Sequence, residues 1–153
     1  MVDWETFSAA QAPLFDYCRF IDEGRVDDFA EIFTADAILE EGPTPTRGRE
    51  AIRALASAVV ARYRSTSHHL SNVRMEALGA GRLRATSYVY AWHEPAEPGE
   101  DLHIWARYID ELRLDDGRWR IAHRRLELAG ARGLKRDPGF AWAPRAGRAM
   151  GEV

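Results

Sequence analysis

The chain lacks the features that would place it in an unusual class of protein. Its 153 residues include only one cysteine, Cys18, so an intrachain disulfide is impossible. Cys18 lies on the apolar side of a predicted helix, where a small buried hydrophobic role is expected rather than that of a nucleophile. The formal net charge is −3 and no block of basic residues is present, so nucleic acid is not an expected partner.

The chain also lacks a long apolar run and a leader-like N-terminus. Arg53 and Arg62 interrupt the most apolar predicted helix, so no segment can span a bilayer and no membrane partner is expected. The first residues carry no basic region followed by an apolar one, as a signal peptide would. These two expectations make a cytoplasmic protein the default. Hydrophobic residues make up 46% and charged residues 29%, which predicts a soluble globular protein with one sizeable core.

Apolar residues at helical spacing dominate the first half of the chain. The predicted helices cover Asp3–Gly24, Val26–Phe33 and Arg49–Arg64, with a short strand at 37–39 and a glycine- and proline-rich loop at 42–48. Asp22 falls in the last turn of the first helix, where the helix dipole disfavours an anion by up to about 1 kcal/mol. A broken local rule of this kind marks a candidate functional residue, and a solvated aspartate is the alternative.

From His68 onward the apolar period changes to two, which predicts strands at about 68–77, 83–94, 102–114 and 118–128. Trp119 and Ile121 are expected to face the interior. Helices followed by consecutive strands indicate an α+β fold, with helices packed on a curved mixed or antiparallel sheet and a pocket between them. The sheet face that the helices leave uncovered is expected to be apolar, which predicts a homo-oligomer, either a trimer or a dimer. Residues 1–130 would form the domain, and 131–153 an arm attached through Phe140 and Trp142.

Histidines provide the strongest chemical signal. His68 and His69 are adjacent, and neighbouring side chains of a strand point to opposite faces, so only one of them can enter the pocket. Asn72 follows His68 at an even interval and should share its face. His93 ends the next predicted strand. Histidine titrates near neutral pH, and an upstream aspartate such as Asp22 could orient it as a base.

Three segments resemble the SnoaL-like branch of the NTF2-like superfamily. They are FIDEGRVDDFAEIFTADAILEE, TSHHLSNVRMEAL and ARYIDELRLDDGRWRIAHRRLEL, and the resemblance covers roughly residues 8 to 128. It implies a cone-shaped fold of three N-terminal helices on a curved sheet. It implies less about function, because one cone-shaped pocket supports many chemistries.

Within that superfamily the catalytic pattern resembles that of the scytalone dehydratases. The resemblance places Asp22 at the family's aspartate and His68 and His93 at its two histidines, 25 residues apart. It implies proton transfer by Asp22, His68 and His93 without a metal or cofactor. A metal held by these three residues is the disfavoured alternative, since such a site needs further supporting groups.

The groups that would recognise a substrate differ from that pattern. The family's two water-holding tyrosines fall at Ile21 and Glu41, and its serine and asparagine fall at Ala106 and Tyr108. Scytalone itself is therefore not the expected substrate. The candidate substrate-binding residues are Tyr17, Asn72, Tyr108 and Glu41.

Together these residues predict a cofactor-independent dehydratase acting on a polycyclic or polyketide-like small molecule. Two alternatives remain. One is an isomerase or cyclase that uses the same base on a polyketide or steroid-like substrate. The other is a non-catalytic protein, either a ligand-binding member of the fold or the small subunit of a ring-hydroxylating dioxygenase.

Overall fold

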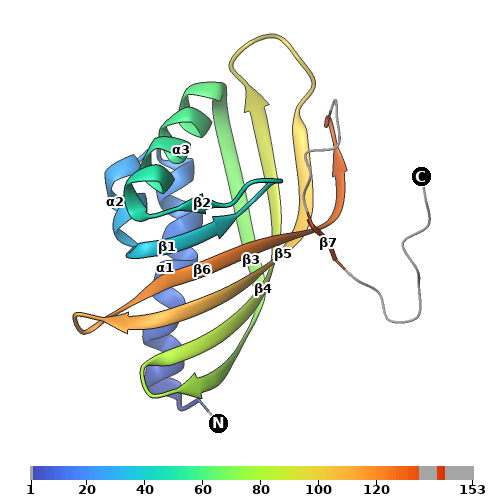
Figure 1. Ribbon diagram of the computed structural model, residues 1–153. Coiled ribbons are helices and arrows are strands. Elements are labelled where there is room, and N and C mark those ends of the chain that lie inside the picture. The colour runs from blue at the N-terminus through green and yellow to red at the C-terminus, as the bar shows by residue number, and fades with distance from the viewer. Residues whose placement is uncertain (1, 135–140, 144–153) are drawn as a thin grey trace.

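Three helices cover one face of a strongly curved sheet, and the long strands wrap around the space beneath them (Figure 1). The computed structural model describes residues 2–134 and 141–143. The helices are α1 (Trp4–Asp22), α2 (Val26–Glu31) and α3 (Arg49–Arg62). The strands are β1 (Phe33–Glu40), β2 (Thr46–Arg47), β3 (Tyr63–Gly79), β4 (Arg82–Pro95), β5 (Leu102–Asp115), β6 (Arg118–Arg132) and β7 (Ala141–Trp142). The predicted α+β cone is confirmed.

The sheet is mixed, with strand order β2-β1-β6-β5-β4-β3. Strands β3 to β6 form an antiparallel meander, whereas β1 pairs in parallel with β6. β7 pairs in parallel with β6 at Glu127 and Leu128, so the C-terminal part returns to the sheet. Phe140, the other predicted attachment point, lies outside the described residues, and the division at residue 130 stays a prediction.

The helix α1 forms for local reasons and is anchored by its apolar side. Asp3 caps its start, because the Asp3 carboxylate accepts a hydrogen bond from the Thr6 amide at 2.8 Å. The apolar face, which includes Leu14, Tyr17 and Cys18, is buried against the sheet. The helix ends at Asp22, so this carboxylate lies where α1 meets β3.

The predicted second helix is too long. In the structure α2 ends at Glu31 rather than at Phe33, and β1 begins at Phe33 rather than at residue 37. Phe33 is fully buried and pairs with Ile121 of β6, so a distant strand partner overrides the local helical pattern. For the same reason α3 ends at Arg62 and β3 starts at Tyr63, five residues before the predicted strand, because Tyr63 pairs with Pro95.

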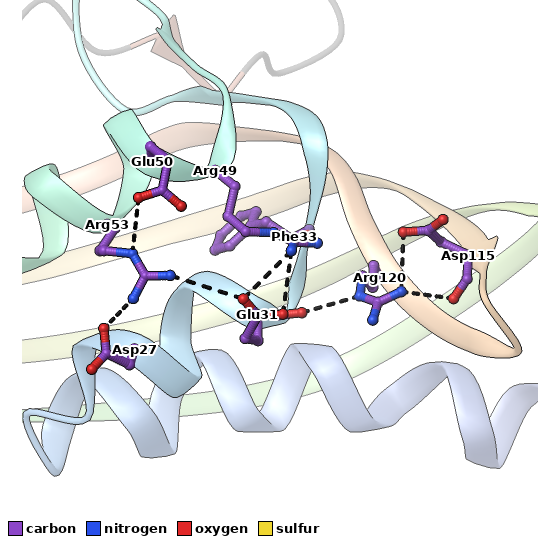
Figure 2. A network of polar contacts seen from close by, with 8 residues as sticks. All are labelled: Asp27, Glu31, Phe33, Arg49, Glu50, Arg53, Asp115 and Arg120. Carbon is purple, nitrogen blue, oxygen red and sulfur yellow. Dashed lines mark hydrogen bonds and ion pairs between the residues drawn. The ribbon is translucent and has the colours of Figure 1, made fainter.

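Arginine side chains hold the junction between α2 and β1 (Figure 2). Arg49 of α3 donates two hydrogen bonds to the carbonyl oxygen of Phe33, at 3.0 and 2.7 Å. Arg120 of β6 donates to the carbonyl oxygen of Glu31 at 3.2 Å. The Glu31 carbonyl lies at the end of α2, where it has no partner within the helix, and Arg120 satisfies it. Arg49 satisfies the first carbonyl of β1, so the two guanidinium groups tie α3 and β6 to the same turn.

Two irregular positions in the strands change which side chains point inward. In β3 an extra residue is accommodated between Ser71 and Arg74, where Asn72 adopts a left-handed conformation with φ of 53°. In β6 the pairing shifts beside Ala122, since Ile121 faces Leu112 and His123 faces Glu111. Each bulge reverses the inward and outward alternation beyond it.

The outer face of the sheet carries an aromatic cluster of His69, Tyr90, His103 and Trp105. Their rings lie 5.5 to 6.1 Å apart, and the Tyr90 hydroxyl is 2.8 Å from His103 Nδ1. Trp105 is 41% exposed. The homo-oligomer expected from this face, a trimer or a dimer, stays a prediction. Within the described part of the chain, every helix is too short or too polar to cross a membrane.

Candidate active site

A cavity of about 690 Å³ lies between the helices and the concave face of the sheet. Apolar side chains from α1, α3, β4 and β5 form most of its wall. Its polar lining includes Tyr17, Glu41, Arg62, His68, His93 and Tyr108. The volume falls in the range of sites that enclose a small molecule.

His68 lines this cavity and forms a hydrogen-bonded pair with Asp22. The distance between His68 Nδ1 and Asp22 Oδ1 is 2.6 Å, and the His68 side chain is 7% exposed. Asp22 also accepts a hydrogen bond from the His68 backbone amide at 2.8 Å and one from the Thr66 hydroxyl at 2.7 Å. Thr66 is a contact that sequence reasoning missed, although its even interval from His68 places it on the same face.

These contacts determine the protonation of the pair. Burial alone would raise the pKa of Asp22, but the hydrogen bonds from the His68 ring, the His68 amide and Thr66 hold that pKa below its usual value. An ionised Asp22 accepts the proton of Nδ1–H, so the free lone pair of a neutral His68 ring lies on Nε2. The arrangement prepares His68 to accept a proton from a molecule in the cavity.

His93 lies beside this pair and is buried. Its ring centroid is 5.1 Å from that of His68, and the two rings are nearly perpendicular at 83°. His93 Nδ1 is buried without a hydrogen-bond partner among the residues that the structure describes. Burial and the neighbouring His68 lower the pKa of His93 to about 4. The ring is therefore neutral near pH 7, where it can hold a polar group but carries no charge.

We expect His93 to make the protein unstable in mild acid. The unfolded chain protonates this histidine near pH 6.5 and the folded chain only near 4, so the unfolded state binds more protons between these values. The free energy of unfolding should fall as pH decreases through that window, by about 3 kcal/mol once the pH is below both pKa values. Urea unfolding at pH 7, 5.5 and 4 measures it. His93→Gln should remove this part of the pH dependence; identical pH dependence in both proteins would contradict the assignment.

The floor of the cavity rests on a buried ion pair that the sequence analysis missed. Arg124 donates to Asp110 at 2.7 and 2.9 Å, and neither side chain has any exposed surface. The guanidinium carbon lies 4.1 Å from the ring centre of Tyr17 and 3.9 Å from that of Tyr108. This cation holds two cavity tyrosines in place through cation–π contacts. Burial raises the pKa of Tyr108 well above its usual value, so its hydroxyl keeps its proton.

Tyr17 and Glu41 meet at another part of the wall. The Tyr17 hydroxyl donates to Glu41 Oε1 at 2.7 Å, and the Tyr17 ring centre is 6.5 Å from that of His68. The structure therefore brings together six of the seven predicted site residues, namely Asp22, His68, His93, Tyr17, Tyr108 and Glu41.

Asn72 is the exception. The even interval from His68 predicts that both share the pocket face, but Asn72 is exposed and does not line the cavity. The bulge after Ser71 is the physical reason, because it breaks the strand alternation on which the prediction depended. By contrast, His69 points away from the cavity and packs beside Tyr90, as strand alternation predicts.

A family model describing a SnoaL-like domain matches residues 5–125. The chain belongs to the SnoaL-like family. This confirms the resemblance given by the three sequence segments. No curated protein sequence matches this SnoaL-like chain.

Solved structures of the same fold are numerous, and several of them carry functional names. A protein of Novosphingobium aromaticivorans DSM 12444, provisionally named a scytalone dehydratase, is 24% identical with a TM-score of 0.84, covering 94% of each chain. Another from that genus, provisionally named an aromatic ring hydroxylase, is 21% identical with a TM-score of 0.82, covering 88% of this chain and 96% of that one. The hexachlorocyclohexane dehydrochlorinase LinA-type3 of Novosphingobium barchaimii LL02 is 23% identical with a TM-score of 0.76, covering 92% and 96%. These likenesses show that the SnoaL-like domain shares their fold.

Proposed function

We propose that this protein is a cofactor-independent lyase that removes water from a polycyclic or polyketide-like molecule. The observation that carries the proposal is the Asp22–His68 pair, whose histidine lines a mostly apolar cavity. Membership of the SnoaL-like family supports it. So do the names of two similar structures, a dehydratase and a dehydrochlorinase, which both denote elimination reactions.

His68 removes a proton from a carbon beside a carbonyl group of the substrate. The Asp22 carboxylate then stabilises the imidazolium that forms, because the pair is already hydrogen-bonded and little reorganisation is needed. The neutral His93 and the protonated Tyr108, which both line the cavity, then hydrogen-bond the substrate oxygen as negative charge develops on it. In a mostly apolar cavity, each of these interactions is stronger than in solution.

Product analysis on a simple cyclic β-hydroxy ketone tests the proposal. We would incubate the protein with 3-hydroxy-1-tetralone in D₂O without added metal or cofactor and follow 1-naphthol by absorbance and deuterium uptake by NMR. Formation of 1-naphthol above the protein-free rate is expected. Deuterium uptake beside the carbonyl without loss of water would instead favour the isomerase or cyclase. Neither product nor uptake, with this ketone or its 3-chloro analogue, would contradict the proposal.

A further inference from the structure

Glu41 is a carboxyl group in an unusual place. It follows the end of β1 and lines the cavity, although the neighbouring Glu40 points elsewhere and lies 2.9 Å from His123 Nε2. Only Oε1 of Glu41 is engaged among the described residues, by the Tyr17 hydroxyl at 2.7 Å. A carboxyl group held by one oxygen has the other oxygen available for a molecule in the cavity.

Tyr17 connects Glu41 to the Asp22–His68 pair. Its hydroxyl donates to Glu41, while its ring packs edge-on to His68 with 6.5 Å between ring centres. Arg124 stacks on the same ring from below, so the tyrosine has little freedom to move. A base and a carboxyl group therefore line one cavity, with a fixed aromatic ring between them.

We propose that Glu41 is the general acid that protonates the departing hydroxyl group, with Tyr17 as its positioning residue. This rests on the proposed elimination and deepens it, because an acid is needed for only some leaving groups. Hydroxide is a poor leaving group and must depart as water. A halide departs without a proton. The site is thus built for β-hydroxy carbonyl substrates rather than for β-halo ones.

His68 Nε2 takes the proton beside the carbonyl, and the electrons of that C–H bond form the carbon–carbon double bond. The carbon–oxygen bond breaks, and its electron pair leaves with the oxygen. That oxygen takes the proton of Glu41 Oε2 and departs as water, so Glu41 becomes a carboxylate and His68 an imidazolium. Return of the proton from His68 to Glu41 through solvent restores the enzyme.

The groups around Glu41 act on its ionisation in opposite directions. Burial raises the pKa of Glu41 above its usual value, and Asp110 on β5 adds to this. The hydrogen bond from Tyr17 on α1 lowers that pKa, as do the positive charge of Arg124 on β6 and the charge on His68 of β3. The net pKa is raised, which favours the protonated acid that the reaction needs.

A comparison of two leaving groups tests the assignment. We would measure kcat/KM of the wild type, Glu41→Gln and the adjacent control Glu40→Gln on 3-hydroxy-1-tetralone and on its 3-chloro analogue, subtracting the rates without protein. Glu41→Gln is expected to lose about 10²–10⁴-fold on the hydroxy ketone, the typical contribution of a general acid, and little on the chloro ketone. Glu40→Gln should retain both activities.

Losses of equal size on the two ketones in Glu41→Gln, or no loss on either, would overturn the assignment. A second measurement needs only the wild-type protein. Its kcat/KM for the hydroxy ketone should fall with increasing pH as Glu41 loses its proton, and the profile for the chloro ketone should lack this fall. Coinciding profiles would also overturn the assignment. A wild type that releases neither water nor chloride would remove the elimination itself, which distinguishes that failure from a wrong acid.

Discussion

His68→Ala is expected to lower the rate of elimination by about 10²–10⁴-fold, whereas His69→Ala should leave turnover almost unchanged. The two residues are neighbours in β3 and undergo the same change. His68 lines the cavity and is bonded to Asp22 at 2.6 Å, while His69 packs beside Tyr90 on the outer face. The difference therefore follows from strand alternation alone.

Both variants should be assayed on 3-hydroxy-1-tetralone after circular dichroism has established that they are folded. His69→Ala removes a 3.0 Å contact with Ser67 on an exposed part of the strand. This variant should therefore show at most a small decrease in the free energy of unfolding. Losses of similar size in two folded variants would show that His68 is not the base.

The second large effect concerns stability. Asp110→Ala is expected to lower the free energy of unfolding by about 3–5 kcal/mol, because it leaves the guanidinium of Arg124 buried without its counter-ion. Burial acts to lower the pKa of Arg124, but in the wild type Asp110 raises it, and the variant loses that support. An arginine side chain keeps its proton in proteins even so, and the charge therefore stays buried without a counter-ion.

Urea unfolding of Asp110→Ala beside Glu111→Ala provides the measurement and its matched control. Glu111 is the next residue and pairs with Arg82 at the surface at 2.7 Å, where a lost ion pair costs at most about 1 kcal/mol. The double variant Asp110→Leu/Arg124→Met should recover much of the loss, since apolar side chains of similar volume carry no charge to solvate. A cost below 1 kcal/mol for Asp110→Ala would contradict this account.

Local patterns were sufficient to predict part of this structure. The end of α1 at Asp22 and the opposite directions of His68 and His69 follow from the chain within a few residues of each position. His93 was predicted from the resemblance to the scytalone dehydratases, and the uninterrupted alternation of β4 from Leu83 to His93 explains why it points inward. These three residues were enough to predict where the cavity would carry its titratable groups.

The parts that sequence reasoning missed depend on contacts between distant segments. Simple alternation from Ile121 would turn His123 inward and Arg124 outward, but the bulge beside Ala122 reverses this and buries the arginine. A charged residue in a strand is also predicted to be exposed unless its partner is known. The partner of Arg124 is Asp110, which lies 14 positions away on the neighbouring strand. Asn72 was misplaced by another bulge.

The triple anchoring of Asp22 links chemistry to local unfolding. One carboxylate binds the ring and amide of His68 and the hydroxyl of Thr66, so it fastens the last turn of α1 to β3. Helix ends open far more readily than whole domains do. When this turn frays, the His68 imidazole loses its counter-ion, and the hydrogen bond that fixes its tautomer is broken. Activity should therefore be lost at a lower denaturant concentration than the one that unfolds the sheet. Substitutions that stabilise the end of α1 should raise the denaturant concentration at which activity is lost.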